Sequence, residues 1–170
     1  MIKVIVSLFL LMFIFQLFSQ VLAKTNELVP KEQLQSLGFT DYESINSNSL
    51  LYQFKRLSEE AKFFFIFNED AKNKYTRNLV KTRFNELIYI INFEKTGFLA
   101  ETVNRYNAFI GKTKVYFPKE NSPTVYKVDP NSSQVKRFVD ILEKLRDMYP
   151  ANSAYWLYIQ QAIDSTKNLK

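Results

Sequence analysis

Apolar residues recur every three or four positions through most of the chain after residue 48. This spacing places them on one face of an α-helix, whereas apolar residues at every second position would indicate a strand. Five such stretches follow one another, so the pattern predicts an all-α fold, a helical bundle of four to five helices. The expected helices cover residues 49–66, 69–92, 98–110, 132–148 and 152–166.

The first two helices, separated by a break at Asn68, form the stretch on which we expect the later helices to pack. The first has an apolar stripe made of Leu50, Phe54, Leu57, Ala61 and Phe64. The second has a stripe made of Val80, Phe84, Leu87 and Ile91. Asn68 suits the N-cap of the second helix, because its side-chain oxygen can accept a bond from a free backbone N–H group.

Four phenylalanines lie just before this break: Phe63, Phe64, Phe65 and Phe67. Such a cluster can line a ligand pocket, or it can close the end of a helix pair. Aromatic side chains supply much of the buried area in protein cores. We therefore expect the cluster to be part of the core.

The segment between the third and fourth helices departs from the helical pattern. Two short β-prone runs flank the turn-forming sequence PKENSP, which predicts a small β-hairpin at residues 113–128. An isolated hairpin is marginally stable in water, so it would need support from the helices. Loops inserted between helices often carry specific contacts, and Tyr116 and Tyr126 are the candidate binding residues here. A tolerated surface loop is the alternative.

The N-terminus is typical of a secretory signal peptide. Lys3 gives a positive start, residues 4–18 are almost wholly apolar, and Val21 and Ala23 fit a cleavage pattern. We therefore expect residues 1–23 to be a signal peptide, with an uncleaved membrane anchor as the alternative. Residues 24–48 are then a linker with a short helix, and residues 49–170 are the helical bundle domain. Both alternatives place the mature chain outside the cytoplasmic membrane.

The chain of 170 residues contains no cysteine and no histidine. This composition excludes thiol nucleophiles, disulfides, Cys/His zinc sites and histidine-based catalytic centres. A cell-envelope enzyme would have to work with carboxylates, as glycan hydrolases do. The acidic residues fall on expected solvated helix faces and in no recognisable motif. We therefore expect no enzymatic activity, no cofactor and no metal ion.

The formal net charge of +6 raises the question of an anionic partner. Lys74, Arg77 and Lys81 form a ridge on the second helix and are candidate binding residues for an anionic envelope polymer. A solvated helix face is the more common reason for such a ridge. The basic charge is also what the codon bias of an AT-rich genome produces, and export argues against nucleic acid as a partner.

Several sequence blocks resemble those of one bacterial family. Residues 49–57, SLLYQFKRL, resemble an S-P-L-Y-x-x-K-R-L signature, and residues 65–72, FIFNEDAK, resemble F-T-F-D-P-E-x-K. Residues 75–86 and 139–165 are similar to the L-x-x-x-R-L-x-E block and to the closing L-E-x-L, x-P and A-I-x-x-S blocks. Their order resembles that of an exported bacterial helical domain, domain of unknown function 5667. Leu50 departs from the signature, which has proline there.

The resemblance implies an exported helical domain behind a signal peptide or a single membrane span, and it transfers no catalytic residue. The matched signature residues, which we expect to be structural, are Ser49, Tyr52, Lys55, Arg56, Phe67 and Asn68. Ser49 would cap the first helix, and Tyr52 and Phe54 would pack on later helices. Lys55 and Arg56 would pair with acidic residues of another helix and fix its register.

These observations together predict a non-catalytic module that binds a protein or the cell envelope. It would be secreted or lie on the extracytoplasmic face of the envelope. A carboxylate-based envelope enzyme and a membrane-associated helical protein are the alternatives.

Overall fold

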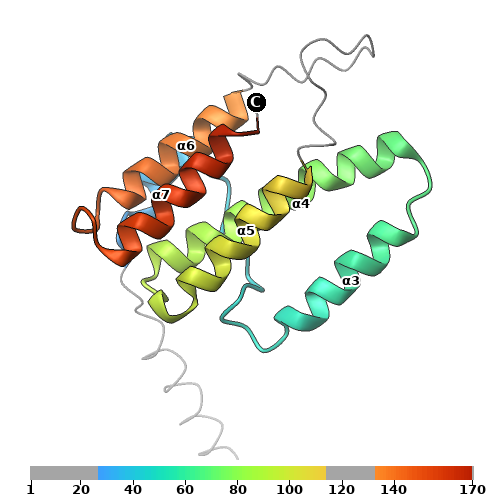
Figure 1. Cartoon of the computed structure of the whole chain (residues 1–170), viewed down its shortest axis with the longest axis horizontal. Coiled ribbons are helices and arrows are strands. Elements are labelled where there is room, and N and C mark those ends of the chain that lie inside the picture. The colour runs from blue at the N-terminus through green and yellow to red at the C-terminus, as the bar shows by residue number, and fades with distance from the viewer. Residues whose placement is uncertain (1–26, 114–132, 170) are drawn as a thin grey trace, which may run out of the picture.

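The computed structural model describes residues 27–113 and 133–169, and this part of the chain is all-helical (Figure 1). The helices are α2 (Lys31–Ser36), α3 (Tyr52–Phe64), α4 (Glu69–Asn92), α5 (Leu99–Thr113), α6 (Ser133–Arg146) and α7 (Ala154–Lys167), with a short 3₁₀ helix, η1 (Thr96–Phe98). The predicted all-α bundle is confirmed for these residues.

The helix boundaries agree with the prediction to within a few residues, with two local differences. Helix α3 begins at Tyr52, and no side chain caps it; the hydroxyl of Ser49 accepts the N–H of Leu51 just ahead of the helix. Helix α5 continues to Thr113, beyond the expected end at residue 110. The prediction that Ser49 caps α3 is therefore wrong.

The β-hairpin predicted at residues 113–128 receives no support from the structure. Its first residue, Thr113, is the last residue of α5. The rest of the segment, including Tyr116 and Tyr126, lies outside the described residues. None of the residues that the structure describes forms a strand.

The core lies between α4, α5, α6 and α7, which pack side by side (Figure 1). The predicted stripe of α4 is confirmed, because Val80, Phe84, Leu87 and Ile91 are all buried. The facing helices add Val103 and Tyr106 from α5, Ile141, Leu142 and Leu145 from α6, and Ile159 and Ile163 from α7. Phe84 stacks on Phe138 of α6 with the ring centroids 3.7 Å apart, which holds α4 against α6.

Helical spacing predicts that Met148 and Tyr155 belong to the apolar stripes of the last two helices, but both lie further out. Met148 is 50% exposed and Tyr155 is 39% exposed. Helix α6 ends at Arg146, so Met148 lies in the turn towards α7 and not on the helical stripe. Tyr155 lies in the first turn of α7, at the end of the bundle, where its ring contacts Tyr149.

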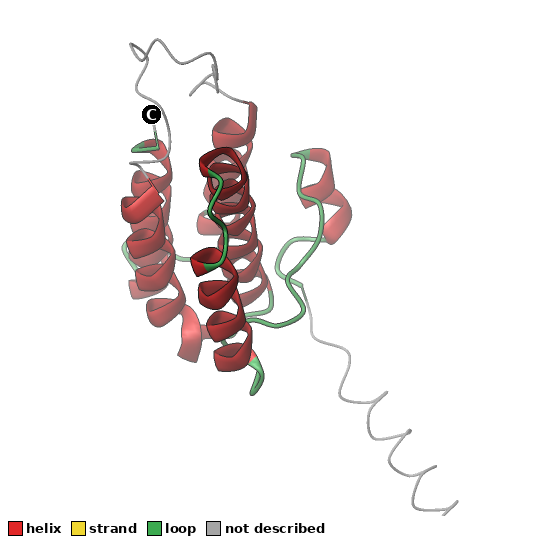
Figure 2. Ribbon diagram, turned by 90° about the vertical axis from the view of Figure 1, so that its right-hand side faces the viewer, coloured by secondary structure: helices red, strands yellow, loops and turns green. Residues whose placement is uncertain are grey.

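The segment before residue 49 contributes to the core, so the packed domain extends beyond the predicted range of 49–170. Val29, Leu34 and Phe39 are buried and belong to the same apolar cluster as α4 to α7. The side-chain amide of Asn92, at the end of α4, bonds the backbone of Val29 twice. Its oxygen accepts the Val29 N–H, and its nitrogen donates to the Val29 carbonyl. Residues 28–39 are therefore packed against the bundle and are not a linker; Figure 2 shows α2 at its edge.

Helix α3 contradicts the predicted core most strongly. Its apolar stripe faces solvent: Leu50 is 97% exposed, Phe54 72%, Leu57 66% and Phe64 75%. The phenylalanine cluster is also exposed at Phe65 and Phe67, so the prediction that it closes the helix pair is wrong. The helix contacts the bundle through its opposite side, where Tyr52 is buried. No described helix covers the apolar stripe, and Figure 1 shows α3 itself on the outer flank of the bundle.

Buried tyrosines make the fold sensitive to high pH. Burial raises the pKa of Tyr149 to about 12, that of Tyr42 to about 12, and that of the fully buried Tyr106 further. Between pH 10 and 12 these tyrosines keep their protons in the folded state, whereas the unfolded chain has lost them. The contribution of these tyrosines to the free energy of unfolding should therefore be complete below pH 10 and should be lost as the pH rises through this range.

Urea denaturation at a series of pH values would measure this loss. The variant Tyr149→Phe removes one of the titrating groups, so its free energy of unfolding should fall less steeply above pH 10. An identical slope in the variant and the wild type would contradict the assignment of Tyr149 to this effect.

Candidate functional site

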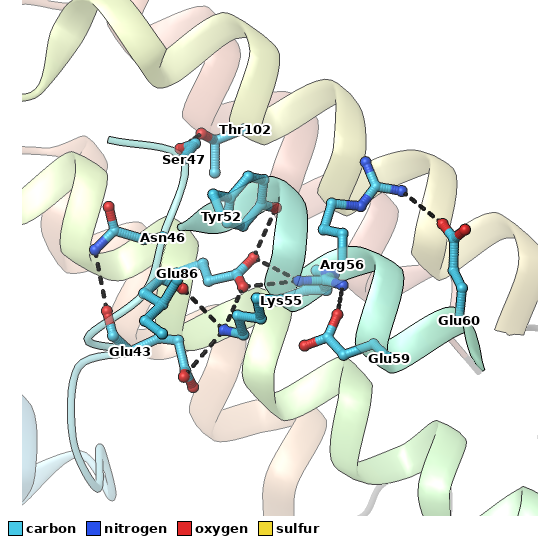
Figure 3. A network of polar contacts seen from close by, with 12 residues as sticks. Glu43, Asn46, Ser47, Tyr52, Lys55, Arg56, Glu59, Glu60, Glu86 and Thr102 are labelled. Atoms are coloured by element: carbon cyan, nitrogen blue, oxygen red, sulfur yellow. Dashed lines mark hydrogen bonds and ion pairs between the residues drawn. The ribbon is translucent and has the colours of Figure 1, made fainter. Parts of the chain in front are cut away.

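A buried network of charged groups joins α3 to α4, and Glu86 of α4 is its centre (Figure 3). The Glu86 side chain is only 2% exposed. It accepts bonds from the Tyr52 hydroxyl at 3.1 Å, from Lys55 Nζ at 2.8 Å and from Arg83 Nη1 at 2.7 and 2.9 Å. Four hydrogen bonds therefore compensate for the removal of this carboxylate from water.

Lys55 extends the network into the chain before α3. Its ammonium group pairs with Glu43 at 3.0 Å and donates to the backbone carbonyl of Ile45 at 2.9 Å. The Lys55 side chain is 14% exposed, so these contacts replace most of its water. The expectation that Lys55 pairs with an acidic residue of the second helix is confirmed by its bond to Glu86.

Arg83 closes the other side of the network. It lies one turn before Glu86 on α4 and also pairs with Glu59 of α3. Burial raises the pKa of Glu59 above its ordinary value, and the charge of Arg83 acts in the opposite direction. Because Arg83 bridges both carboxylates, it holds α3 against α4 at one register.

Among the other signature residues, Arg56 and Phe67 differ from the expectation and Asn68 agrees with it. Arg56 pairs with Glu60 one turn along its own helix at 3.4 Å, so it does not link two helices. Phe67 is 87% exposed and contributes nothing to the core. Asn68 is confirmed as the N-cap of α4, since its side chain accepts the N–H of Ala71 at 2.9 Å.

An open cavity of about 650 Å³ lies between α3, α4 and α5, next to the charged network. Its apolar lining comes from Phe63 of α3, Leu79 of α4 and Phe109 of α5, among others. Its cationic lining groups are Arg56, Arg83, Arg105 and Lys112, and its acidic ones are Glu59 and Glu60. This size falls within the range of small-molecule sites, and the lining carries both apolar and charged surface.

The predicted basic ridge lies elsewhere, on the N-terminal half of α4. Lys74 and Lys81 are exposed and Arg77 is half-buried. None of the three lines the cavity, and none forms an ion pair with another described residue. The structure therefore does not join the ridge to the cavity or to the charged network.

The carboxylates near the cavity do not have the arrangement that glycan hydrolysis needs. That reaction requires two acids facing each other across a cleft. The acidic lining residues, Glu59 and Glu60, are consecutive in α3, and Glu59 is already bound by Arg83. Among the described residues, no group of three or more acidic side chains is placed to hold a metal ion.

The sequence pattern indicates neither the network nor the cavity as a site. Arg83 and Glu86 were noted only within a matching block, and Arg105 and Phe109 carried no signal of their own. One signal was available: Arg83 and Glu86 adjoin Phe84 and Leu87 in the apolar run of α4. Opposite charges three residues apart at such positions indicate a buried ion pair.

No family model, curated protein or solved structure matches the chain. The resemblance to domain of unknown function 5667 therefore stays a prediction. None of the helices that the structure describes combines the length and the apolar character needed to cross a membrane.

Proposed function

We propose that this chain is an exported, non-catalytic module of the bacterial cell envelope that binds another protein through the outer face of α3. One observation carries the proposal: the apolar stripe of α3 faces solvent along the whole helix. A contiguous exposed apolar surface of this kind marks an interaction site more often than scattered apolar residues do. We define the outer face of α3 as Phe54, Leu57, Ala61 and Phe64 together with Leu50, which lies in the turn just before the helix.

The spacing within the outer face favours a helical partner. Within α3 its residues are separated by three, four and three positions, which is the repeat of a helix that packs along a second helix. The charged network supports partner binding at the outer face of α3, because it holds the helix on the bundle through polar contacts on the opposite side. A partner can therefore bind the apolar side without displacing the helix.

The location and family belong to the same proposal. The apolar segment at residues 4–18, with the cleavage pattern at Val21 and Ala23, supports export. The resemblance to domain of unknown function 5667 points the same way. The bound carboxylates of Glu59 and Glu86 support a structural use of the acidic residues and not a catalytic one.

An anionic envelope polymer is a second candidate partner, favoured by the unpaired basic ridge. Lys74 and Lys81 are exposed on one face of α4. Exposed lysines are common on any protein surface, however, whereas an exposed stripe of phenylalanine and leucine is not. The outer face of α3 is therefore the stronger candidate.

Photo-crosslinking in living cells would test the proposal. A photoreactive phenylalanine analogue at Phe54 should form a discrete adduct with one protein in the envelope fraction. The same analogue at Lys144, an exposed residue of α6, is the matched control and should form none. Identical adducts from both positions, lipid adducts alone, or a cytoplasmic location of the chain would contradict the proposal. The analogue at Lys74 would reveal a polymer at the basic ridge.

A further inference from the structure

We propose that the cavity between α3, α4 and α5 binds a small amphipathic anion, with its carboxylate at Arg105 and its apolar body against Phe63 and Phe109. The site is separate from the outer face of α3, whose residues do not line it. The inference therefore goes beyond the proposed binding of a protein partner.

Arg105 has a hydrogen-bond donor that no described residue uses. Its Nη2 pairs with Glu101 on the same helix, whereas its Nη1 is buried and has no partner among the described residues. The guanidinium carbon lies 5.0 Å from the centroid of the Tyr52 ring, and the side chain is 21% exposed. A buried donor without an acceptor is costly, and a ligand carboxylate would satisfy it once the guanidinium turns to bring Nη1 to the cavity surface.

Every arginine of the cavity has an acidic partner, but only Arg105 keeps a buried donor without an acceptor among the described residues. Arg83 is bound by Glu59 and Glu86, and Arg56 is paired with Glu60. The remaining cation is Lys112, two turns beyond Arg105 on α5, which is exposed and has no ion pair among the described residues. Lys112 is therefore the cation among the described lining residues that has no acidic partner.

The rest of the lining suits an apolar ligand body. Ala108 and Phe109 lie between Arg105 and Lys112 on α5, while Phe63 and Leu79 line the cavity from α3 and α4. The volume of about 650 Å³ is sufficient for a ligand of this kind. An anionic group at one place in a mostly apolar site matches a medium-chain fatty acid or a similar amphiphile.

Isothermal titration calorimetry of the full chain with dodecanoate would test this. We expect one binding site, and no comparable binding of dodecyltrimethylammonium, which has the same apolar chain and the opposite charge. The variant Arg105→Gln should weaken dodecanoate binding about tenfold or more, because a charge-assisted bond is lost. Lys112→Gln should have a smaller effect, because Lys112 is exposed.

Two further variants separate this site from other apolar surfaces. Ala108→Trp places a large side chain at the exposed rim of the cavity and should abolish binding while circular dichroism shows an intact fold. Phe54→Ser changes the outer face of α3 and should leave dodecanoate binding intact. The proposal is overturned if both amphiphiles bind equally, if Ala108→Trp still binds dodecanoate, or if Phe54→Ser alone removes binding. The last result would assign the amphiphile to the outer face of α3 and leave the crosslinking test of the protein partner unaffected.

Discussion

Replacing Glu86 by alanine should lower the free energy of unfolding by about 3–5 kcal/mol, the usual cost of breaking a buried ion pair on one side. The carboxylate accepts four hydrogen bonds, from Tyr52, Lys55 and Arg83. Its removal leaves two cationic side chains with most of their surface buried and with less opposite charge nearby. Urea denaturation followed by circular dichroism would measure the change.

The matched control is Glu60→Ala. Glu60 also accepts from an arginine, Arg56, but its side chain is 70% exposed, so water replaces the lost contact. Its removal should change the free energy of unfolding by less than about 1 kcal/mol. If both variants lose the same stability, the buried network is not what holds α3 on the bundle.

The loss in Glu86→Ala should begin at α3. This helix has few apolar contacts with the bundle, so the polar network supplies much of its attachment. Hydrogen exchange in α3 should therefore accelerate more than in α6 and α7, which lie on the far side of the core. Uniform acceleration through all helices would show that α3 and the core unfold as one unit.

Helical periodicity predicted the fold well wherever the apolar stripe is covered by other helices. Helices α4 to α7 follow this rule, and the stripe from Val80 to Ile91 is buried as expected. The same pattern failed for α3, because periodicity shows that a helix has an apolar face but not what covers it. An apolar stripe that faces solvent has the same sequence spacing as one that is buried in the core.

The charged network could be predicted only in part, for a different reason. Lys55 was expected to bind an acidic residue of another helix, and it does. Arg56 was given the same role, but neighbouring helix positions differ by about 100° in direction, so Arg56 faces its own helix partner, Glu60. Choosing between Lys55 and Arg56 required the rotation of α3 on the bundle, which sequence spacing does not contain.

The sequence does not predict the packing of the segment before residue 49, because its few apolar residues have no long periodic pattern. Val29, Leu34 and Phe39 are too widely separated to form a helical stripe, yet each is buried. The residue that makes this packing possible is Asn92, a polar residue at the end of an apolar run. Its side chain satisfies the backbone of Val29, so an irregular segment can be buried without unpaired polar groups.

Replacing Asn92 by alanine should therefore lower the free energy of unfolding by about 2–4 kcal/mol, since each unpaired buried polar group costs about 1–3 kcal/mol. The side chain of Asn92 is fully buried. Its oxygen accepts the N–H of Val29 at 2.8 Å, and its amide donates to the Val29 carbonyl at 2.9 Å and to the Tyr42 hydroxyl at 2.7 Å. Chemical denaturation would measure the loss.

The matched control is Asn78→Ala, which removes an exposed asparagine of the same helix. This change should alter the free energy of unfolding by no more than about 0.5 kcal/mol. In Asn92→Ala, deuterium uptake at residues 28–39 should rise before uptake in α6 and α7, because the lost bonds anchor that segment alone. If the segment stays protected and stability matches that of Asn78→Ala, apolar burial of Val29 and Leu34 is sufficient to hold it, and Asn92 is not its anchor.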